Sequence, residues 1–379
     1  FSNDLSLTED HKRFIEHFQK FSNEVLRPLG EKAEREEKYP LEVYQKMAEQ
    51  GYFGISFPEK YGGAAMDHVA LALMFEELGS VSASLTLGIY CHMVLSLTPF
   101  HLYGSEEQKQ RYLIPGIQGK KIGAWGITEP SAGSDLAAIQ SRADLQGNEY
   151  VINGSKIFTT NGTFADYVVI TAYTQKAAGM KGITLFVVDK GTPGFHVARR
   201  IKTVGVRGSE TTELVFENCR VPKSQILGEV DKGFYNALNA LTGGRIVAAS
   251  FAIGLARAAM EQGLRYTKER KQFGKPIFEN QGVSWAFSDI ATTIEAARLL
   301  THKAARLADA GKPHIKEASM AKLFATENAS KICAQAMQLH GGYGLTEEFP
   351  AEKFFRDAKL LEIGEGTNQI HRNMIAKFL

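Results

Sequence analysis

The chain has 379 residues, enough for two or three domains with a substantial core. Its 44 Lys and Arg residues nearly balance its 42 Asp and Glu residues, so the formal net charge is +2 and we expect no nucleic-acid partner. The three cysteines, Cys91, Cys219 and Cys333, are too few and too widely spaced for a disulfide framework or a structural zinc site. We therefore expect a reducing compartment and no metal.

Residues 1–120 are predicted to form a helical domain. Ser6 and Glu9 have the spacing of a capping box. The apolar residues from Phe14 to Leu29 then recur every three or four positions, which is the period of one helix face.

An uncharged stretch covers residues 78–100 and is long enough to span a bilayer. Its serines, threonines and single proline interrupt the sustained apolarity that a membrane helix needs, so we expect a buried helix and no membrane span. Such a helix could also line an apolar ligand cavity.

Residues 121–230 are predicted to form a β domain. Short β-branched runs at 167–171 and 183–188 alternate with Asn-Gly and Pro-Gly pairs, which are strand and turn signals. Glycine is in excess, at 36 residues against roughly 27 for an average chain of this length, and many of these glycines lie between residues 119 and 208. That density of turns is typical of an antiparallel sheet or barrel.

Helical patterning returns over residues 231–379, where apolar positions from Val283 to Ala297 again follow a helical period. The fold class is therefore α+β, with helices, then a sheet, then helices. Because strands do not alternate with helices, a doubly wound nucleotide-binding fold is not expected.

Several common catalytic motifs are missing from the sequence. It has no Gly-x-Gly-x-x-Gly after a strand, no P-loop, no His-Glu-x-x-His and no Gly-x-Ser-x-Gly. Four clusters rich in polar residues and glycine remain, at residues 123–135, 156–162, 269–276 and 338–369.

The first cluster, Gly-Ala-Trp-Gly-Ile-Thr-Glu-Pro-Ser-Ala-Gly-Ser-Asp at 123–135, closely resembles the flavin loop of the acyl-CoA dehydrogenase family, with its pattern T-E-P-x-A-G-S-D. Four more segments resemble that family in the same order: a second flavin segment (156–162), a dimer-crossing segment (269–274), an adenine segment (338–344) and the catalytic signature (362–370). The chain is thus identified as a member of this FAD-dependent family.

The resemblance implies an architecture of helical N-terminal domain, antiparallel β-barrel-like middle domain and C-terminal four-helix bundle. It also implies the reaction: oxidation of the Cα–Cβ bond of an acyl-CoA thioester to a trans-2-enoyl-CoA. A base takes the α-proton, the β-hydrogen passes as hydride to flavin N5, and an electron-transfer flavoprotein accepts the electrons. A homotetramer, built as a dimer of dimers, is the implied assembly.

By its place in the signature, Glu365 is the expected base. Relatives that use another glutamate carry it on an earlier helix, at the position occupied here by Gly244, so only Glu365 is available. Gly364 stands where short- and medium-chain members commonly have tyrosine. The pair of Ile363 and Gly364 before Glu365 instead resembles the isovaleryl members of the family. The preferred acyl chain is left open.

The resemblance also implies the contacts of both ligands. Arg270 would bind the pyrophosphate from a neighbouring subunit, since its guanidinium forms forked hydrogen bonds to phosphate. The expected cofactor residues are Trp125, Ile127, Thr128, Ser134, Phe158, Thr160, Arg270, Gln272, Phe273, Gln281, Gln338, Gly342, Thr367 and Gln369. The expected substrate residues are Ser134, Gly244, Arg245 and Gly366.

Two other functions stay open at this stage. One is an oxidase or monooxygenase of the same fold, and the other is a non-enzymatic assembly partner. Both are disfavoured by the intact Glu365, which such oxidases commonly lose. The expected location is the cytoplasm of a bacterium or the mitochondrial matrix of a eukaryote, without secretion.

Overall fold

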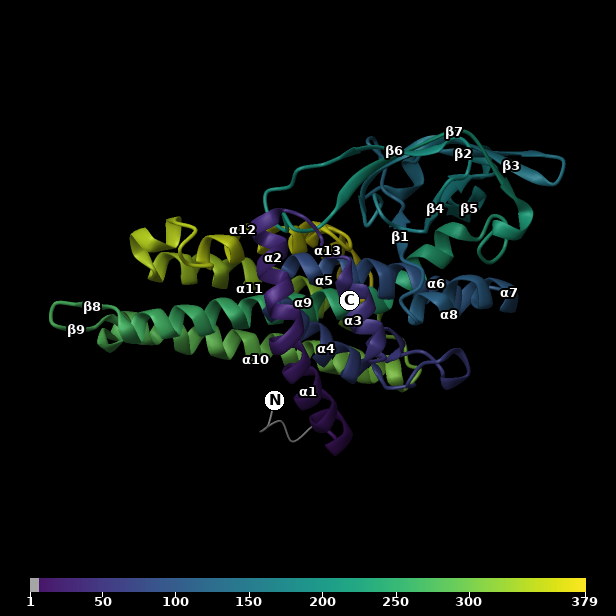
Figure 1. The fold of residues 1–379 in the computed structure, drawn as a ribbon. Helices are drawn as coiled ribbons and strands as arrows, with labels where there is room; N and C mark the ends of the chain where they lie inside the picture. Colours follow the sequence, from purple (N-terminus) through teal and green to yellow (C-terminus); the bar gives the residue numbers. More distant parts are fainter. Residues whose placement is uncertain (1–6) are drawn as a thin grey trace.

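The computed structural model describes residues 7–379 (Figure 1). The predicted role of Ser6 lies outside these residues. The first helix, α1, begins at Glu9, and Thr8 is its N-cap: the Thr8 hydroxyl accepts a hydrogen bond of 3.2 Å from the backbone N–H of His11. The predicted order of a helical, a β and a second helical part is confirmed, and its boundaries near residues 120 and 230 stay a prediction.

The N-terminal part is built around two buried helices, α4 and α5. The uncharged stretch 78–100 begins in α4, runs through α5 and continues into the helical segments that follow it. The chain is extended at Ser82 between α4 and α5, and the Ser82 hydroxyl caps α5 by accepting from the N–H of Leu85. This break was not predicted. The helices are α1 (Glu9–Phe21), α2 (Arg27–Glu36), α3 (Glu42–Glu49), α4 (His68–Val81), α5 (Ala83–Tyr90), the π-helical η4 (Cys91–Leu97), α6 (Thr98–Tyr103), α7 (Glu106–Gln108) and α8 (Ile114–Ile117).

Two helical stretches of the described chain, Ala83–Tyr103 and Gly233–Glu269, are long and apolar enough to cross a membrane. In each, most of the apolar window is buried inside the protein, 83% and 78% respectively, as in a helix of the core. The absence of a membrane span stays a prediction.

One seven-stranded sheet forms the middle part, in the order β1-β4-β2-β3-β7-β6 with β5 paired to β4. Most pairings are antiparallel, as expected, but β1 and β2 each run parallel to β4. Strand β4 pairs with β1, β2 and β5, and both β4 and β5 are almost entirely buried. The strands are β1 (Gly123–Gly126), β2 (Arg142–Gln146), β3 (Glu149–Thr160), β4 (Tyr167–Tyr173), β5 (Ile183–Asp189), β6 (Phe195–Arg200) and β7 (Thr211–Pro222).

The C-terminal part packs four long helices against one another, and a short hairpin projects from their far end (Figure 1). The helices are α9 (Gly233–Glu269), α10 (Gln281–Asp309), α11 (Ile315–Leu339) and α12 (Ala351–Ile363), followed by α13 (Asn368–Ala376). The hairpin consists of β8 (Lys271–Gln272) and β9 (Lys275–Pro276).

The two helical parts meet where α4 crosses α9. Gly254 is needed at this crossing, since a Cβ there would lie 1.9 Å from the carbonyl oxygen of Glu76. Beside it, the buried carboxylate of Glu76 binds Arg298 of α10 at 2.8 Å, and that of Glu77 binds Arg257 of α9 at 2.6 Å. These charges are paired across the junction, which fixes how the two helical parts sit together.

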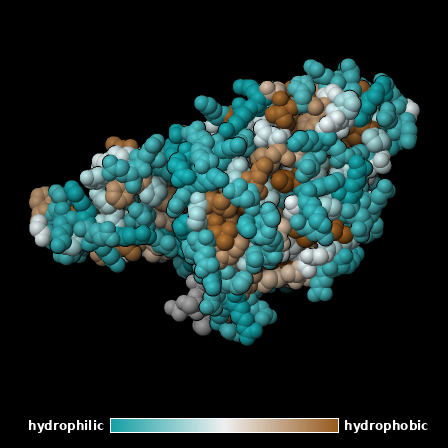
Figure 2. All heavy atoms as spheres, in the orientation of Figure 1, coloured by the Kyte–Doolittle hydropathy of each residue, from teal (hydrophilic) through white to brown (hydrophobic). Residues whose placement is uncertain are grey.

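The face drawn in Figure 2 is mainly hydrophilic, with separate apolar patches among the charged side chains. Single exposed apolar residues are ordinary on a folded protein. Two aromatic residues near the hairpin stand out, because Phe273 is 97% exposed and Trp285 is 60% exposed.

Candidate active site

Glu365 lies in the link between α12 and α13, where the backbone is left-handed at both Glu365 and Gly366, with φ of +58° and +88°. Its carboxylate Oε1 accepts a hydrogen bond from the Tyr90 hydroxyl of α5. Gly244 of α9 faces the same oxygen, since a Cβ there would stand 2.4 Å from Oε1 of Glu365. Only glycine at position 244 therefore leaves room for the Glu365 carboxylate.

Burial raises the pKa of Glu365 to about 7. The hydrogen bond from Tyr90 and the positive charges of Arg245 and Lys322 act in the opposite direction, because they favour the ionised form. Arg245 is only 6% exposed, and its Nε has no hydrogen-bond partner among the described residues. The site thus holds a carboxyl group that can both take and release a proton near neutral pH.

The backbone around Glu365 is fixed by side chains of α11 and α13. Lys322 donates to the carbonyl oxygen of Gly366 at 2.7 Å and to Oδ1 of Asn368 at 3.0 Å. Burial lowers the pKa of His371 to about 4, so its ring is neutral, and its Nε2–H donates to the carbonyl oxygen of Glu365 at 3.1 Å. These bonds hold the left-handed turn that presents the carboxylate.

The two predicted flavin segments lie side by side in the β domain. The carbonyl oxygen of Thr128 accepts from the N–H of Ile157 at 2.8 Å. Next to it, the buried Lys156 ammonium binds Oε1 of Glu129 at 2.7 Å, and Glu129 also accepts from the N–H of Ser141. The two segments are thus joined through both backbone and side chains.

Several groups in these segments fit a flat polar ligand. Phe158 sits at an irregularity of β3 with φ of +58°, and its side chain is 60% exposed. Three buried polar atoms have no hydrogen-bond partner among the described residues: Trp125 Nε1, Thr159 Oγ1 and Asn161 Oδ1. Buried polar atoms are normally satisfied, so these are available to a bound group such as a flavin ring. Of the other predicted residues here, Thr160 is buried, Ile127 and Thr128 are partly buried, and Ser134 is exposed.

The remaining predicted cofactor residues form two groups. Thr367 and Gln369 lie at the start of α13 beside Glu365, and the Thr367 hydroxyl caps that helix. The second group lies around the hairpin and the end of α11, and all of its members are exposed: Arg270, Gln272, Phe273, Gln281, Gln338 and Gly342. Arg270 lies over the ring of Tyr343, at 5.9 Å from its centre, which places the hairpin and the 338–344 segment together.

This second group lies far from the flavin segments of the same chain. In Figure 1 the hairpin projects at the left end of the helices, whereas the β domain is at the upper right. Arg270 of this chain therefore does not lie beside the predicted flavin segments of the same chain (Figure 1).

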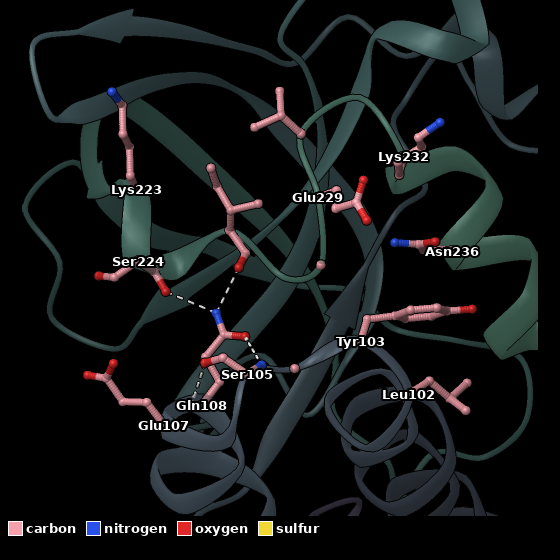
Figure 3. A pocket seen from close by; sticks show the side chains of 14 residues that line it. Leu102, Tyr103, Ser105, Glu107, Gln108, Lys223, Ser224, Glu229, Lys232 and Asn236 are labelled. Carbon is pink, nitrogen blue, oxygen red and sulfur yellow. Dashed lines mark hydrogen bonds between the residues drawn. The ribbon is translucent and has the colours of Figure 1, made fainter.

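A cavity of about 800 Å³ lies elsewhere, between α6, α7, the β7–α9 link and the start of α9 (Figure 3). Gln108 at its floor donates to the carbonyl oxygens of Ser224 and Ile226 at 2.9 and 2.7 Å. The cavity is lined by both lysine and glutamate side chains and by none of the predicted site residues. The two hydrogen bonds of Gln108 join α7 to the segment that follows β7.

Sequence reasoning missed three residues that contact the Glu365 turn, namely Tyr90, Lys322 and His371. A signal existed for one of them, since Tyr90 lies in the uncharged stretch 78–100 that could line a ligand cavity. The other two lie on helices whose periodicity gives no sign of the contact.

Comparisons with known proteins point to one family in all three parts of the chain. Family models of the acyl-CoA dehydrogenase N-terminal, middle and C-terminal domains match residues 8–120, 124–219 and 231–379. The short-chain-specific acyl-CoA dehydrogenase of Clostridium acetobutylicum is 42% identical over 98% of both chains. The human mitochondrial short-chain-specific enzyme is 40% identical over 99% of this chain and 91% of its own.

The fold also matches that of a solved chain. It comes from work on the electron-transferring flavoprotein of Acidaminococcus fermentans and matches with a TM-score of 0.96 at 42% identity, covering 99% of both chains. On the three domain matches and the similarity to these enzymes, the chain belongs to the acyl-CoA dehydrogenase family, whose enzymes depend on FAD.

Proposed function

We propose that this enzyme oxidises the Cα–Cβ bond of an acyl-CoA thioester to a trans-2-enoyl-CoA, with Glu365 as the base that takes the α-proton. The observation that carries the proposal is the partly buried Glu365 side chain, whose carboxylate has a pKa raised to about 7 by desolvation. A base works best with a pKa close to the operating pH, because it is then largely ionised yet still basic. The fixed left-handed turn supplies the orientation that proton abstraction requires.

FAD, when bound, supplies the acceptor for the β-hydride at flavin N5. The residues proposed to hold its ring are those of the two joined segments: Trp125, Ile127, Thr128, Ser134, Phe158 and Thr160. The unpartnered atoms of Trp125, Thr159 and Asn161 support this placement, since a ring with polar edges would satisfy them.

The thioester is proposed to lie between α9 and the Glu365 turn, at Ser134, Gly244, Arg245 and Gly366. The backbone N–H of Glu365 would donate to the thioester oxygen and stabilise the charge that develops when the α-proton leaves. Arg245 is a buried cation next to this position, which favours the same charge. Short, branched and aromatic acyl groups all remain candidates for the substrate.

The second half of the FAD site is proposed to come from another copy of this chain. The exposed Arg270, Gln272, Phe273, Gln281, Gln338 and Gly342 would then meet the pyrophosphate and adenosine, with Thr367 and Gln369 completing the contacts. The exposure of Phe273 supports this, because burying a large apolar side chain of the hairpin against a partner would stabilise the assembly. The expected assembly is a homotetramer built as a dimer of dimers.

The proposed electron acceptor is an electron-transfer flavoprotein. The similarity to a chain solved in work on such a flavoprotein supports this choice. Relatives from a bacterium and from human mitochondria support the cytoplasm or the mitochondrial matrix as the location.

Anaerobic titration with a panel of acyl-CoA thioesters tests the proposal. The purified protein should be yellow, and at least one thioester should bleach its flavin absorbance. A colourless protein that takes up no FAD contradicts the proposal. Rapid reoxidation by dioxygen with release of peroxide would identify an oxidase instead of a dehydrogenase.

A further inference from the structure

Tyr90 occupies a defined place beside Glu365. It is the last residue of α5, its side chain is 5% exposed, and its ring packs edge-on against Phe75 with centres 6.1 Å apart. Its hydroxyl donates to Oε1 of Glu365 and lies 3.4 Å from the carbonyl oxygen of Gly244. The phenol is therefore held between the α9 backbone and the carboxylate.

Other ionisable groups also face Glu365, and they act on it differently. Arg245 and Lys322 influence the carboxylate through their charge, while the hydrogen bonds of Lys322 go to Gly366 and Asn368. His371 is neutral and binds the backbone oxygen of Glu365. The ionisable groups that act on Glu365 or are acted on by it are Tyr90 of α5, Cys91 of η4, Arg245 of α9, Lys322 of α11 and His371 of α13, and Glu362 of α12 acts in turn on Lys322.

Among the hydrogen bonds between described residues, the one from Tyr90 is the direct contact to the Glu365 carboxylate. We propose that Tyr90 is the positioning residue for Glu365: its O–H fixes one carboxylate oxygen, leaves the other oxygen for the substrate, and favours the ionised form. This inference rests on the proposed role of Glu365 as the base.

The physical reason for such a partner lies in the burial of the base. Burial alone favours the protonated carboxyl group, which cannot abstract a proton. A phenol that donates to the charged form opposes this without adding a charge of its own. At the same time it restricts rotation of the carboxylate, so that a single oxygen is presented to the α-proton.

Tyr90→Phe removes the hydroxyl and keeps the ring. A chemically matched control is Tyr44→Phe: Tyr44 of α3 is 1% exposed, and its hydroxyl donates to the carbonyl oxygen of Gly88 in the same helix α5 at 3.1 Å. Both variants lose one buried tyrosine hydroxyl, but of the two only the Tyr90 hydroxyl contacts Glu365. Flavin content and melting temperature report whether each variant is folded.

The first measurement is the pH dependence of anaerobic flavin bleaching by an acyl-CoA that reduces the wild type. For Tyr90→Phe we expect the acid limb to move up by about one pH unit, so that the rate at pH 6 falls about tenfold further than at pH 9. Tyr44→Phe should keep the wild-type profile. An unmoved limb in Tyr90→Phe, or the same shift in both variants, would overturn the inference.

A second measurement does not depend on turnover. Infrared difference spectra of the wild type against Glu365→Gln isolate the carboxyl band of Glu365, and its titration gives the pKa directly. If no thioester bleaches the wild type, the proposed function fails, but a midpoint that rises in Tyr90→Phe alone still supports the pairing. A midpoint that does not change overturns it, whether or not the enzyme turns over.

Discussion

Gly244 of α9 and Glu365 of the α12–α13 link are far apart in the sequence but lie against each other: a Cβ at residue 244 would lie 2.4 Å from Oε1 of Glu365 and 2.7 Å from the Tyr90 hydroxyl. The two positions at which enzymes of this family are expected to carry the base thus face each other across the same small space. A side chain at 244 and a carboxylate at 365 in its present place exclude each other.

Gly244→Ala should therefore displace the carboxylate without touching the flavin segments. We expect an acyl-CoA bleaching rate lower by about a hundredfold, because a shift of about 1 Å is enough to misalign a base, with FAD content retained. Gly243→Ala is the matched control, since nothing lies within 4 Å of a Cβ at residue 243 of the same helix. Equal rates in the two variants would show that Glu365 does not act from its present position.

The buried pair of Lys156 and Glu129 should be important for stability. Lys156→Met leaves the Glu129 carboxylate buried without its cation, and we expect a loss of about 3–5 kcal/mol in the free energy of unfolding together with loss of FAD. Arg199→Met removes an exposed partner of Glu213 and should cost less than about 1 kcal/mol. Chemical unfolding followed by circular dichroism, with flavin absorbance, measures both. A small loss of unfolding free energy in Lys156→Met would argue against a stabilising role of the Lys156–Glu129 ion pair.

His92 should make the protein less stable in acid. Its Nε2–H donates to the carbonyl oxygen of Gly116 and its Nδ1 accepts from the N–H of Gly123, and burial lowers its pKa from 6.5 to about 4. Because the folded pKa is depressed, this contribution to stability is complete above pH 6.5 and is lost as the pH falls toward 4.

Unfolding free energies measured between pH 7 and pH 4.5 test this. The wild type should lose stability more steeply than His92→Gln, by about 1.2 kcal/mol between pH 6 and pH 5. His371 has a similarly lowered pKa, so some dependence should remain in the variant. Parallel curves would mean that His92 takes up a proton in the folded protein.

A shared FAD site makes a prediction about mixed chains. Arg270→Ala and Glu365→Gln should each be inactive alone, but a hybrid dimer would contain one site with both native residues. Co-refolded or co-expressed chains should then regain about a quarter of the wild-type bleaching amplitude. No recovery on mixing would mean that Arg270 serves the site of its own chain, or none.

The sequence alone predicted the order of the domains and the segments that carry polar groups, because these depend on local periodicity and on residue order. It could not predict the break at Ser82, where a hydroxyl cap interrupts a stretch of the chain that carries no charged residue. Nor could it predict the parallel pairing of β1 with β4, which is decided by how the strands pack.

The contacts of Glu365 were the hardest to anticipate. Tyr90 and Lys322 both contact the Glu365 turn, yet they lie 275 and 43 residues before Glu365 in the sequence. Such contacts depend on which helix faces which, and a hydrophobic pattern gives only the buried face of each helix. The sequence shows a tyrosine and a lysine at these positions, but only the packing of the helices shows that they contact the Glu365 turn.

The central claim is that Glu365 takes the α-proton, and Glu365→Gln tests it most directly because the amide keeps the size of the side chain. In rapid-mixing experiments with a bleaching acyl-CoA, the variant should retain FAD and bind the thioester, while the bleaching rate falls by about a thousandfold at every pH between 6 and 9. Bleaching at the wild-type rate with an unchanged pH profile would contradict the account and place the base elsewhere.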